Sequence, residues 1–399
     1  MLLLLLFFNI SVKERGTKYP FVRLLDMKKK ERMKIYTLLL GALFVSPTQA
    51  QTMHDWENHH VLQINREPAR AAFTPFSVHK GDGSISLDGT WKFRWTPVPN
   101  ERVMNFYQTN FNDKDWTDFP VPANWEVNGY GTPIYVSAGY PFKIDPPRVM
   151  GEPKTDYTTY KERNPVGQYR RTFVLPAGWE ANGQTFLRFE GVMSAFYVWI
   201  NGKRVGYSQG SMEPSEFNVT KYLKSGENQI SLEVYRYSDG SYLEDQDFWR
   251  FGGIHRSIHL IHTPDIHVRD YAVRTLPASA GDYEDFILQI DPQFSVYRGM
   301  TGKGYVLQGV LKDASGKEVA TLKGDVEDML DLEHKASRMN EWYPQRGPRK
   351  MGRLSAIIKS PERWTAETPY LYKLHLTLQN GEGKVVEQIE QAVGFRSVE

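Results

Sequence analysis

One thirteen-residue stretch restricts the fold of this chain more than any other: "AFYVWINGKRVGY", residues 195–207. Phe196, Val198 and Ile200 alternate with other residues, which is the two-residue period of a β-strand with one face in a core. Asn201-Gly202 follows at once, and this dipeptide suits the positive φ angles of a two-residue hairpin turn. The stretch therefore predicts two antiparallel neighbours in a sheet.

The same alternation recurs along most of the chain. "WKFRW" sets Trp91, Phe93 and Trp95 against basic residues, and "NQISLEVYRY" alternates in the same way. Glycine and proline separate these runs, and long amphipathic helical patterns are scarce. We therefore predict an all-β fold, with a β-sandwich over residues 80–263.

A second group of short strands follows the Thr263-Pro264 break, and its length and hairpin spacing predict an immunoglobulin-like β-sandwich over residues 264–396. Within it, residues 327–350 are polar and poorly patterned, which predicts a long loop or an insertion.

The amino-terminal region resembles a targeting segment, and we assign residues 1–50 to it. From Met27 a basic stretch precedes an apolar run from Ile35 to Val45 and small residues ending at Ala50, which is the layout of a cleaved secretory signal. The apolar run is too short to span a bilayer as a helix. We expect translation to start at Met27 or Met33, export to a periplasm, no membrane association after cleavage, and an amino-terminal arm over residues 51–79.

Charge and composition exclude several function classes. With 49 basic and 47 acidic residues the formal net charge is +2, so nucleic acid is not an expected partner. The absence of cysteine excludes thiol nucleophiles and cysteine zinc sites. Nucleophile elbows, phosphate loops and paired zinc-binding histidines are also missing from the sequence. Carboxylates remain as the candidate chemical groups.

The acidic loop "YLEDQDFWRFGGIHR", residues 242–256, holds the most concentrated set of carboxylates. Asp245 and Asp247 would share one face of a strand. A glycosidase pair must approach the scissile bond from opposite sides, so two residues of one strand do not suffice. On these residues alone, a turn that binds backbone amides or a cation is the better interpretation. Asn340-Glu341 in "MNEW" is a second, weaker candidate pair.

Several segments together resemble the large β-galactosidases of glycoside hydrolase family 2. They include "DWENHHVLQINREPAR", "FPVPANWEVNGYGTPIY", "GVMSAFYVWINGKRVGYSQG", "YSDGSYLEDQDFWRFGGIHRSI" and "RWTAETPYLY". The β-glucuronidases and β-mannosidases of the family are the alternatives. The resemblance implies a jelly-roll sugar-binding domain at 80–263, an immunoglobulin-like domain at 264–396, and residues 397–399 at the start of a catalytic TIM barrel. Both catalytic glutamates would lie in that barrel, so we expect no catalytic residue here and no activity from this chain alone.

The resemblance also assigns residues to two sites. Asp247 would contact the galactosyl group and hold a sodium ion with ligands from the barrel, so without the barrel we expect it to be exposed to solvent. Ser137 would replace a substrate-contacting asparagine, with a shorter reach.

A divalent site for Mg²⁺ or Ca²⁺ would use Asp55, Asn58, the carbonyl of Val61, Gln209 and Asp239, and would attach the arm to the first domain. Taken singly, Asp239-Gly240 is an ordinary turn and Asp55 an ordinary helix cap.

Three functions remain open. In the first, the chain is part of a β-galactosidase that binds its galactoside substrate only together with the barrel, and the full-length enzymes of the family often form oligomers. In the second, it is a free carbohydrate-binding or interaction module. In the third, it is an inactive portion of the enzyme. For the second, Trp125, Trp249 and Tyr130 are candidates for stacking on sugar rings.

Overall fold

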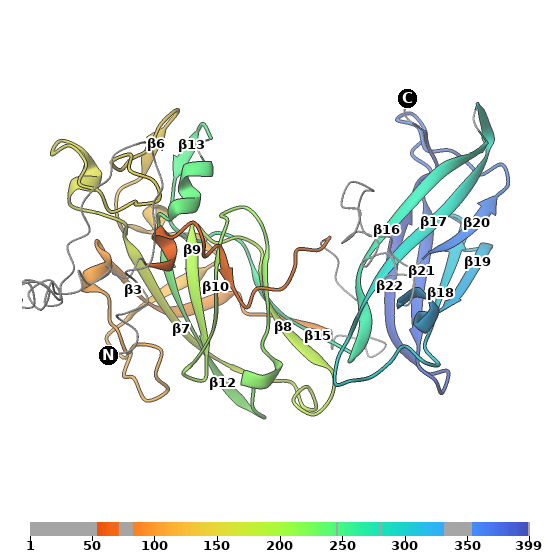
Figure 1. The fold of residues 1–399 in the computed structure, drawn as a ribbon, viewed down its shortest axis with the longest axis horizontal. Helices are drawn as coiled ribbons and strands as arrows, with labels where there is room; N and C mark the ends of the chain where they lie inside the picture. Colours follow the sequence, from red (N-terminus) through yellow and green to blue (C-terminus); the bar gives the residue numbers. More distant parts are fainter. Residues whose placement is uncertain (1–53, 72–82, 245, 280, 331–352, 398–399) are drawn as a thin grey trace, which may run out of the picture. The chain divides into compact units, whose positions relative to one another are not determined.

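The computed structural model describes residues 54–71, 83–244, 246–279, 281–330 and 353–397. The described residues are almost all strand, short 3-10 helix or loop, and the predicted all-β class is confirmed (Figure 1). The expected targeting segment, most of the polar segment at 327–350, and the Asn340-Glu341 pair lie outside the described residues. None of the helices within the described ranges is both long and apolar enough to cross a membrane.

The first sandwich is built on a seven-stranded antiparallel sheet in the order β1-β10-β9-β12-β7-β3-β4. Its strands, in that order, are Gln63–Ile64, Lys203–Gln209, Ala195–Ile200, Glu227–Tyr235, Val166–Val174, Gly89–Thr96 and Thr117–Val121. A second sheet in the order β11-β8-β15-β2 consists of Ser215–Asn218, Gln184–Phe189, Ile258–Thr263 and Ser84–Ser86. Two small ribbons complete it: β13 (Phe248–Arg250) with β6 (Ile134–Val136), and β14 (Gly253–Ile254) with β5 (Ala123–Asn124).

The predicted hairpin is present in the seven-stranded sheet. β9 and β10 pair antiparallel, and Asn201 and Gly202 between them have φ angles of +50° and +78°. Phe196, Val198 and Ile200 are buried in the first core, as their alternation predicts. In β3, Trp91 and Phe93 are likewise buried in that core. These two strands show that local alternation alone located the core face.

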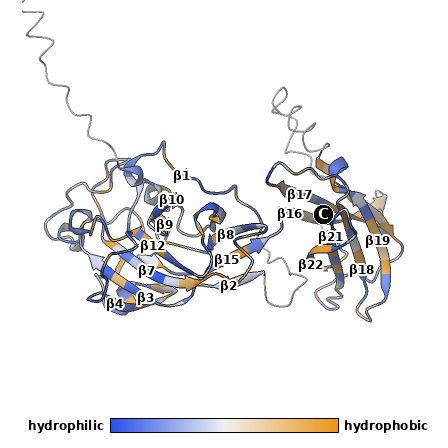
Figure 2. Cartoon of the chain, turned by 90° about the horizontal axis from the view of Figure 1, so that it is seen from below, coloured by the Kyte–Doolittle hydropathy of each residue, from blue (hydrophilic) through white to orange (hydrophobic). Residues whose placement is uncertain are grey.

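The second sandwich pairs a three-stranded sheet with a four-stranded one and has its own core. The orders are β16-β17-β20 and β19-β18-β21-β22. The strands are Ile266–Ser279, Asp282–Val296, Leu354–Ile358, Glu318–Asp325, Val306–Lys312, Tyr372–Gln379 and Val385–Val393. Hydrophobic and hydrophilic residues alternate along strands of both sandwiches (Figure 2), and in β18 every second residue is buried.

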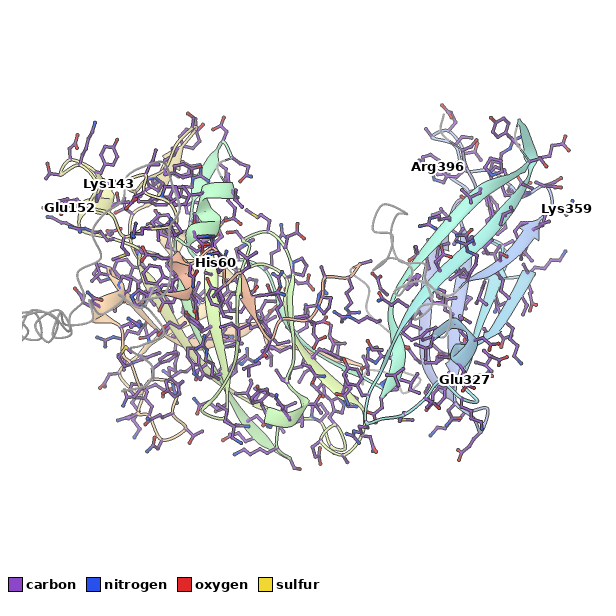
Figure 3. The ribbon with its side chains drawn as sticks, in the orientation of Figure 1. His60, Lys143, Glu152, Glu327, Lys359 and Arg396 are labelled. Atoms are coloured by element: carbon purple, nitrogen blue, oxygen red, sulfur yellow. The ribbon has the colours of Figure 1, made fainter. Side chains whose placement is uncertain are left out.

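One segment differs from its prediction as a loop. Residues 326–330 are helical, and Val326 and Met329 pack into the second core while Glu327 lies exposed beside them (Figure 3). The apolar spacing of three residues places both side chains on one helical face, which explains the turn.

The amino-terminal arm attaches to the edge of the seven-stranded sheet through its main chain. β1 pairs with β10, and Asn65 Nδ2 donates to the Val205 carbonyl at 2.8 Å. A Cβ on Gly206 would lie only 2.2 Å from the Ile64 carbonyl oxygen, so the close approach of the arm requires glycine there.

Candidate functional site

The acidic loop leads into a two-stranded ribbon formed by β13 (Phe248–Arg250) and β6 (Ile134–Val136). Trp249 is directly opposite Tyr135 in the register, so their side chains share one face of the ribbon. Because side chains alternate along a strand, Ser137 and Asp247 extend this same face from the two strand ends. The ribbon therefore places one carboxylate, two hydroxyls and two aromatic rings together.

Asp247 is exposed, as expected, and is bound by a residue that the sequence interpretation missed. The Tyr135 hydroxyl donates a short hydrogen bond to Asp247 Oδ1, and this bond raises the pKa of Tyr135. Ser137 is also exposed. The alternation in "PIYVS" sets Tyr135 and Ser137 on one face and could have indicated Tyr135 beforehand.

The acidic loop and the residues just before it do not form one continuous strand. Residues Asp239–Leu243 form a 3-10 helix (η8), and Ser238 and Ser241 cap its start by exchanging hydrogen bonds with each other's backbone. Asp247 precedes the strand β13, and Asp245 lies outside the described residues. Ser238 at the cap position favours the start of a helix over a continued strand. Strand alternation alone does not reveal this preference.

Of the three candidate stacking residues, one was wrongly assigned. Trp125 is fully buried in the first core, and its indole ring lies against Gly167 and Gly252. Tyr130 is partly buried and its hydroxyl is hydrogen bonded to Thr117. Trp249 is 48% exposed and stacks on Phe251 with 5.8 Å between ring centroids, so it alone of the three offers an open aromatic face.

The predicted divalent-metal residues are drawn from the arm, the end of β10 and the start of η8. Asp55 begins a short 3-10 helix (η3, Asp55–Glu57) that contacts η8, where Asp239 lies. Gln209 ends β10, and its side chain is hydrogen bonded to Asp239. Asn58 and Val61 follow η3, where the Val61 amide donates to the Asn58 carbonyl at 2.8 Å.

The donor set contains one buried oxygen in need of a partner. Asp239 is 8% exposed, burial raises the pKa of its carboxyl, and its Oδ1 has no hydrogen-bond partner among the described residues. Asp55 Oδ2 is held by the Tyr197 hydroxyl at 2.9 Å and by Arg204 at 3.0 Å. Two carboxylates with amide and carbonyl oxygens suit a hard cation such as Mg²⁺ or Ca²⁺, so these residues fit the predicted ion.

The structure offers less for sodium at Asp247. Nowhere in the described ranges do three or more histidine or acidic side chains form a group that could hold a metal ion. A sodium ion at Asp247 therefore stays a prediction that needs ligands from elsewhere.

Family models match both sandwiches. The model for the glycosyl hydrolases family 2 sugar-binding domain matches residues 85–264, and a second model, for glycosyl hydrolases family 2, matches residues 266–396. The chain belongs to glycosyl hydrolase family 2. A β-galactosidase of Priestia megaterium is 36% identical over 376 residues, covering 91% of this chain and 34% of that protein. One from Halalkalibacterium halodurans is 39% identical over 352 residues, covering 85% and 31%.

Solved structures share the fold of this family 2 chain. A Bacteroides uniformis β-glucuronidase aligns with a TM-score of 0.56 at 22% identity, covering 79% of this chain and 32% of that one. A Bifidobacterium dentium β-glucuronidase aligns with a TM-score of 0.56 at 20% identity, covering 80% and 50%. The chain spans about a third of the length of the curated β-galactosidases it matches.

Proposed function

We propose that this chain supplies the sugar-facing ribbon of a β-galactosidase. The observation that carries the proposal is the exposed Asp247 carboxylate, which Tyr135 orients beside the open face of Trp249. Identity to curated β-galactosidases along nearly the whole chain supports the choice of galactosides over glucuronides.

In this proposal the chain binds and orients substrate but does not cleave it. Asp247 accepts hydrogen bonds from galactosyl hydroxyls, and the Tyr135 bond fixes which carboxylate oxygen faces the sugar. Trp249 and Tyr135 offer apolar ring surface to the sugar. The acid/base and the nucleophile of a retaining mechanism would come from a barrel domain, so the 399-residue chain should not hydrolyse a chromogenic β-galactoside.

A chimera tests the role of Asp247. Residues 54–397 would replace the corresponding third of the Priestia megaterium β-galactosidase. We expect an active chimera, in which Asp247→Asn lowers kcat/KM by about 10²-fold because the substrate loses its positioning contact.

Asp118→Asn serves as the matched control, since Asp118 is an exposed aspartate on β4. An active chimera that is indifferent to Asp247→Asn would contradict the proposal. Calorimetric binding of galactose by the 399-residue chain alone would instead favour a free carbohydrate-binding module.

We further propose that a divalent cation bound by the Asp55, Asn58, Val61, Gln209 and Asp239 oxygens attaches the arm to the first sandwich. Chelation should lower Tm by about 5–8 °C, and excess Mg²⁺ or Ca²⁺ should restore it, because the ion binds only the folded chain.

The effect of Asp239→Asn on Tm should have opposite signs with and without the metal ion. The amide avoids the cost of burying a charge, so in chelator the variant should melt at or above the temperature of the unchanged chain. With Mg²⁺ the order should reverse, since the variant gains nothing from the ion. Equal responses of both proteins to chelator, measured by differential scanning fluorimetry, would refute the site.

A further inference from the structure

The sugar-facing ribbon is a two-stranded sheet, separate from the larger sheets of the sandwiches. Its strands come from parts of the chain that are far apart in the sequence. Two strands by themselves are marginally stable in water, so contacts outside the pair are needed to fix the direction of the ribbon. The register places Arg250 opposite Ile134 at the base of the ribbon, whereas Asp247 lies beyond the other end. Contacts at the base therefore help to set the position of Asp247.

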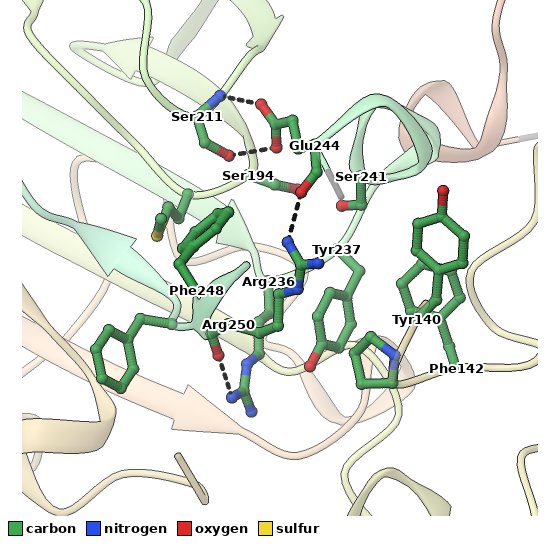
Figure 4. Close-up of a pocket in the computed structure, with 13 residues that line it drawn as sticks. Tyr140, Phe142, Ser194, Ser211, Arg236, Tyr237, Ser241, Glu244, Phe248 and Arg250 are labelled. Carbon is green, nitrogen blue, oxygen red and sulfur yellow. Dashed lines mark hydrogen bonds between the residues drawn. The ribbon is translucent and has the colours of Figure 1, made fainter. Parts of the chain in front are cut away.

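One buried guanidinium binds the main chain of both strands at this base. Arg236 is 2% exposed and follows β12, a central strand of the seven-stranded sheet. Its Nη2 donates to the Thr132 carbonyl at 2.9 Å and to the Arg250 carbonyl at 2.5 Å, and Figure 4 draws the second of these bonds. Thr132 lies just before β6 and Arg250 ends β13, so a single nitrogen joins the two strands. The Arg236 amide donates to the Pro165 carbonyl at 3.0 Å, which ties the residue to the sheet.

Two glutamates hold Arg236 and Thr132 in place. Arg236 Nε lies 3.2 Å from Glu126 Oε1, and the two side chains are 0% and 1% exposed. Glu126 Oε2 accepts from the amide of Gly252, just after β13, at 3.0 Å. Glu162 accepts from both the amide and the hydroxyl of Thr132, each at 3.2 Å. The charge of Arg236 is thus paired inside the protein, while its hydrogen bonds are directed at the ribbon.

We propose that Arg236 is a positioning residue for the galactoside, which holds the ribbon so that Asp247 and the open face of Trp249 meet the sugar together. This role rests on the proposed function, in which Asp247 orients the substrate. Arginine suits the task because its planar fork can face a carboxylate and backbone carbonyls at once and keeps its charge when buried. Arg236 would not itself touch the sugar, but a displacement of the ribbon by about 1 Å is enough to cost much of the activity.

The test uses the chimera with the Priestia megaterium β-galactosidase. Arg236→Lys keeps a positive charge beside Glu126, but one amine cannot replace the fork that reaches Glu126 and both carbonyls. We expect this variant to lower kcat/KM about 10-fold. In a chimera that already carries Asp247→Asn, the same substitution should change kcat/KM by at most about 3-fold, because the contact that it misplaces is already lost. A purely structural role would give the same loss in both backgrounds.

Arg170→Lys is the matched control. Arg170 is 5% exposed on β7, its Nε pairs with Asp113 at 2.7 Å, and its Nη1 donates to the carbonyls of Phe106 and Gln108. It is therefore a buried arginine with one carboxylate and two carbonyl partners, none of which belongs to the ribbon. We expect Arg170→Lys to leave kcat/KM within about 2-fold of the unchanged chimera.

Hydrogen exchange of the 399-residue chain is a second measurement, and it needs no activity. Arg236→Lys should speed amide exchange in peptides that cover residues 132–137 and 247–251, while exchange in β9 and β10 stays unchanged. If the lysine variant fails to fold, Arg236→Met combined with Glu126→Gln removes both charges together and should give the same local effect.

The outcomes separate this role from the proposed function. A chimera that is indifferent to Asp247→Asn would contradict the proposed function. A costly Asp247→Asn together with a harmless Arg236→Lys, or with equal losses from Arg236→Lys in both backgrounds, would overturn the positioning role alone. Unchanged exchange in the ribbon would overturn it as well.

Discussion

Replacing Trp125 by alanine is expected to lower the free energy of unfolding of the first sandwich by about 3–5 kcal/mol. The indole ring is fully buried and packs against Phe93 in the core. Its N–H donates to the buried Tyr169 hydroxyl, so the substitution removes a hydrogen bond as well as apolar contacts. The cavity left by the ring adds to this loss.

Glycines at two positions far apart in the sequence leave room for the Trp125 ring. A Cβ on Gly167 would lie 2.5 Å from the ring of Trp125, and one on Gly252 would lie 2.4 Å from it. Trp249→Ala is the matched control, since that ring is exposed, and its effect on stability should stay within about 0.5 kcal/mol. Urea unfolding of both variants measures the contrast. Similar losses in the two would contradict the assignment of Trp125 to the core and Trp249 to the surface.

Glu387→Gln is expected to remove most of the pH dependence of stability between about pH 5 and pH 8 in the second sandwich. Glu387 lies on β22 and is 2% exposed, and its Oε2 accepts from the Val268 amide at 2.8 Å. Its Oε1 has no hydrogen-bond partner among the described residues. Burial raises the pKa of this carboxyl to about 8 from an ordinary value of 4.5.

The direction of this pH dependence follows from the number of protons bound in the folded and the unfolded states. Between pH 4.5 and pH 8 the folded chain keeps a proton on Glu387 that the unfolded chain releases. The stabilisation is therefore complete below the unfolded pKa, falls by about 1.4 kcal/mol per pH unit as pH rises, and is lost above the folded pKa. Glutamine keeps the acceptor for Val268 without ionising. At pH 8.5 we expect the variant to be more stable than the unchanged chain by about 2–4 kcal/mol.

Denaturant titrations at about pH 5, 7 and 8.5 measure this prediction. Glu367→Gln is the control in the same sandwich, because Glu367 is exposed. If Glu387→Gln and Glu367→Gln showed the same pH profile, Glu387 would not be the titrating group.

The fold could be predicted wherever the information was local. Alternation identified the core faces of β3 and β9, and Asn201-Gly202 identified the turn, because both depend on residues adjacent in sequence. The ribbon of β6 and β13 could not be predicted in this way, since its two strands are far apart along the chain. Trp125 was misplaced for the same reason: what buries it is the absence of side chains at Gly167 and Gly252.

The candidate site was predicted in part. The family resemblance predicted Asp247 and the metal residues. The structure brings three of the metal residues, Asp55, Gln209 and Asp239, into one region. Tyr135 was missed although it alternates with Ser137, because its contact with Asp247 depends on the pairing of β6 with β13, two strands far apart in the sequence. The orphaned oxygen of Asp239 is a property of packing and has no signature in sequence.

The pairing of the arm with β10 tolerates substitutions in the arm but not at one position of β10. Main-chain groups of Gln63 and Ile64 form the ladder, so substitutions there leave the hydrogen bonds in place. The requirement falls instead on Gly206, where any side chain would meet the Ile64 carbonyl. The sequence of the arm is therefore free to vary during evolution, whereas position 206 must stay glycine. A single added methyl group there would separate β1 from β10.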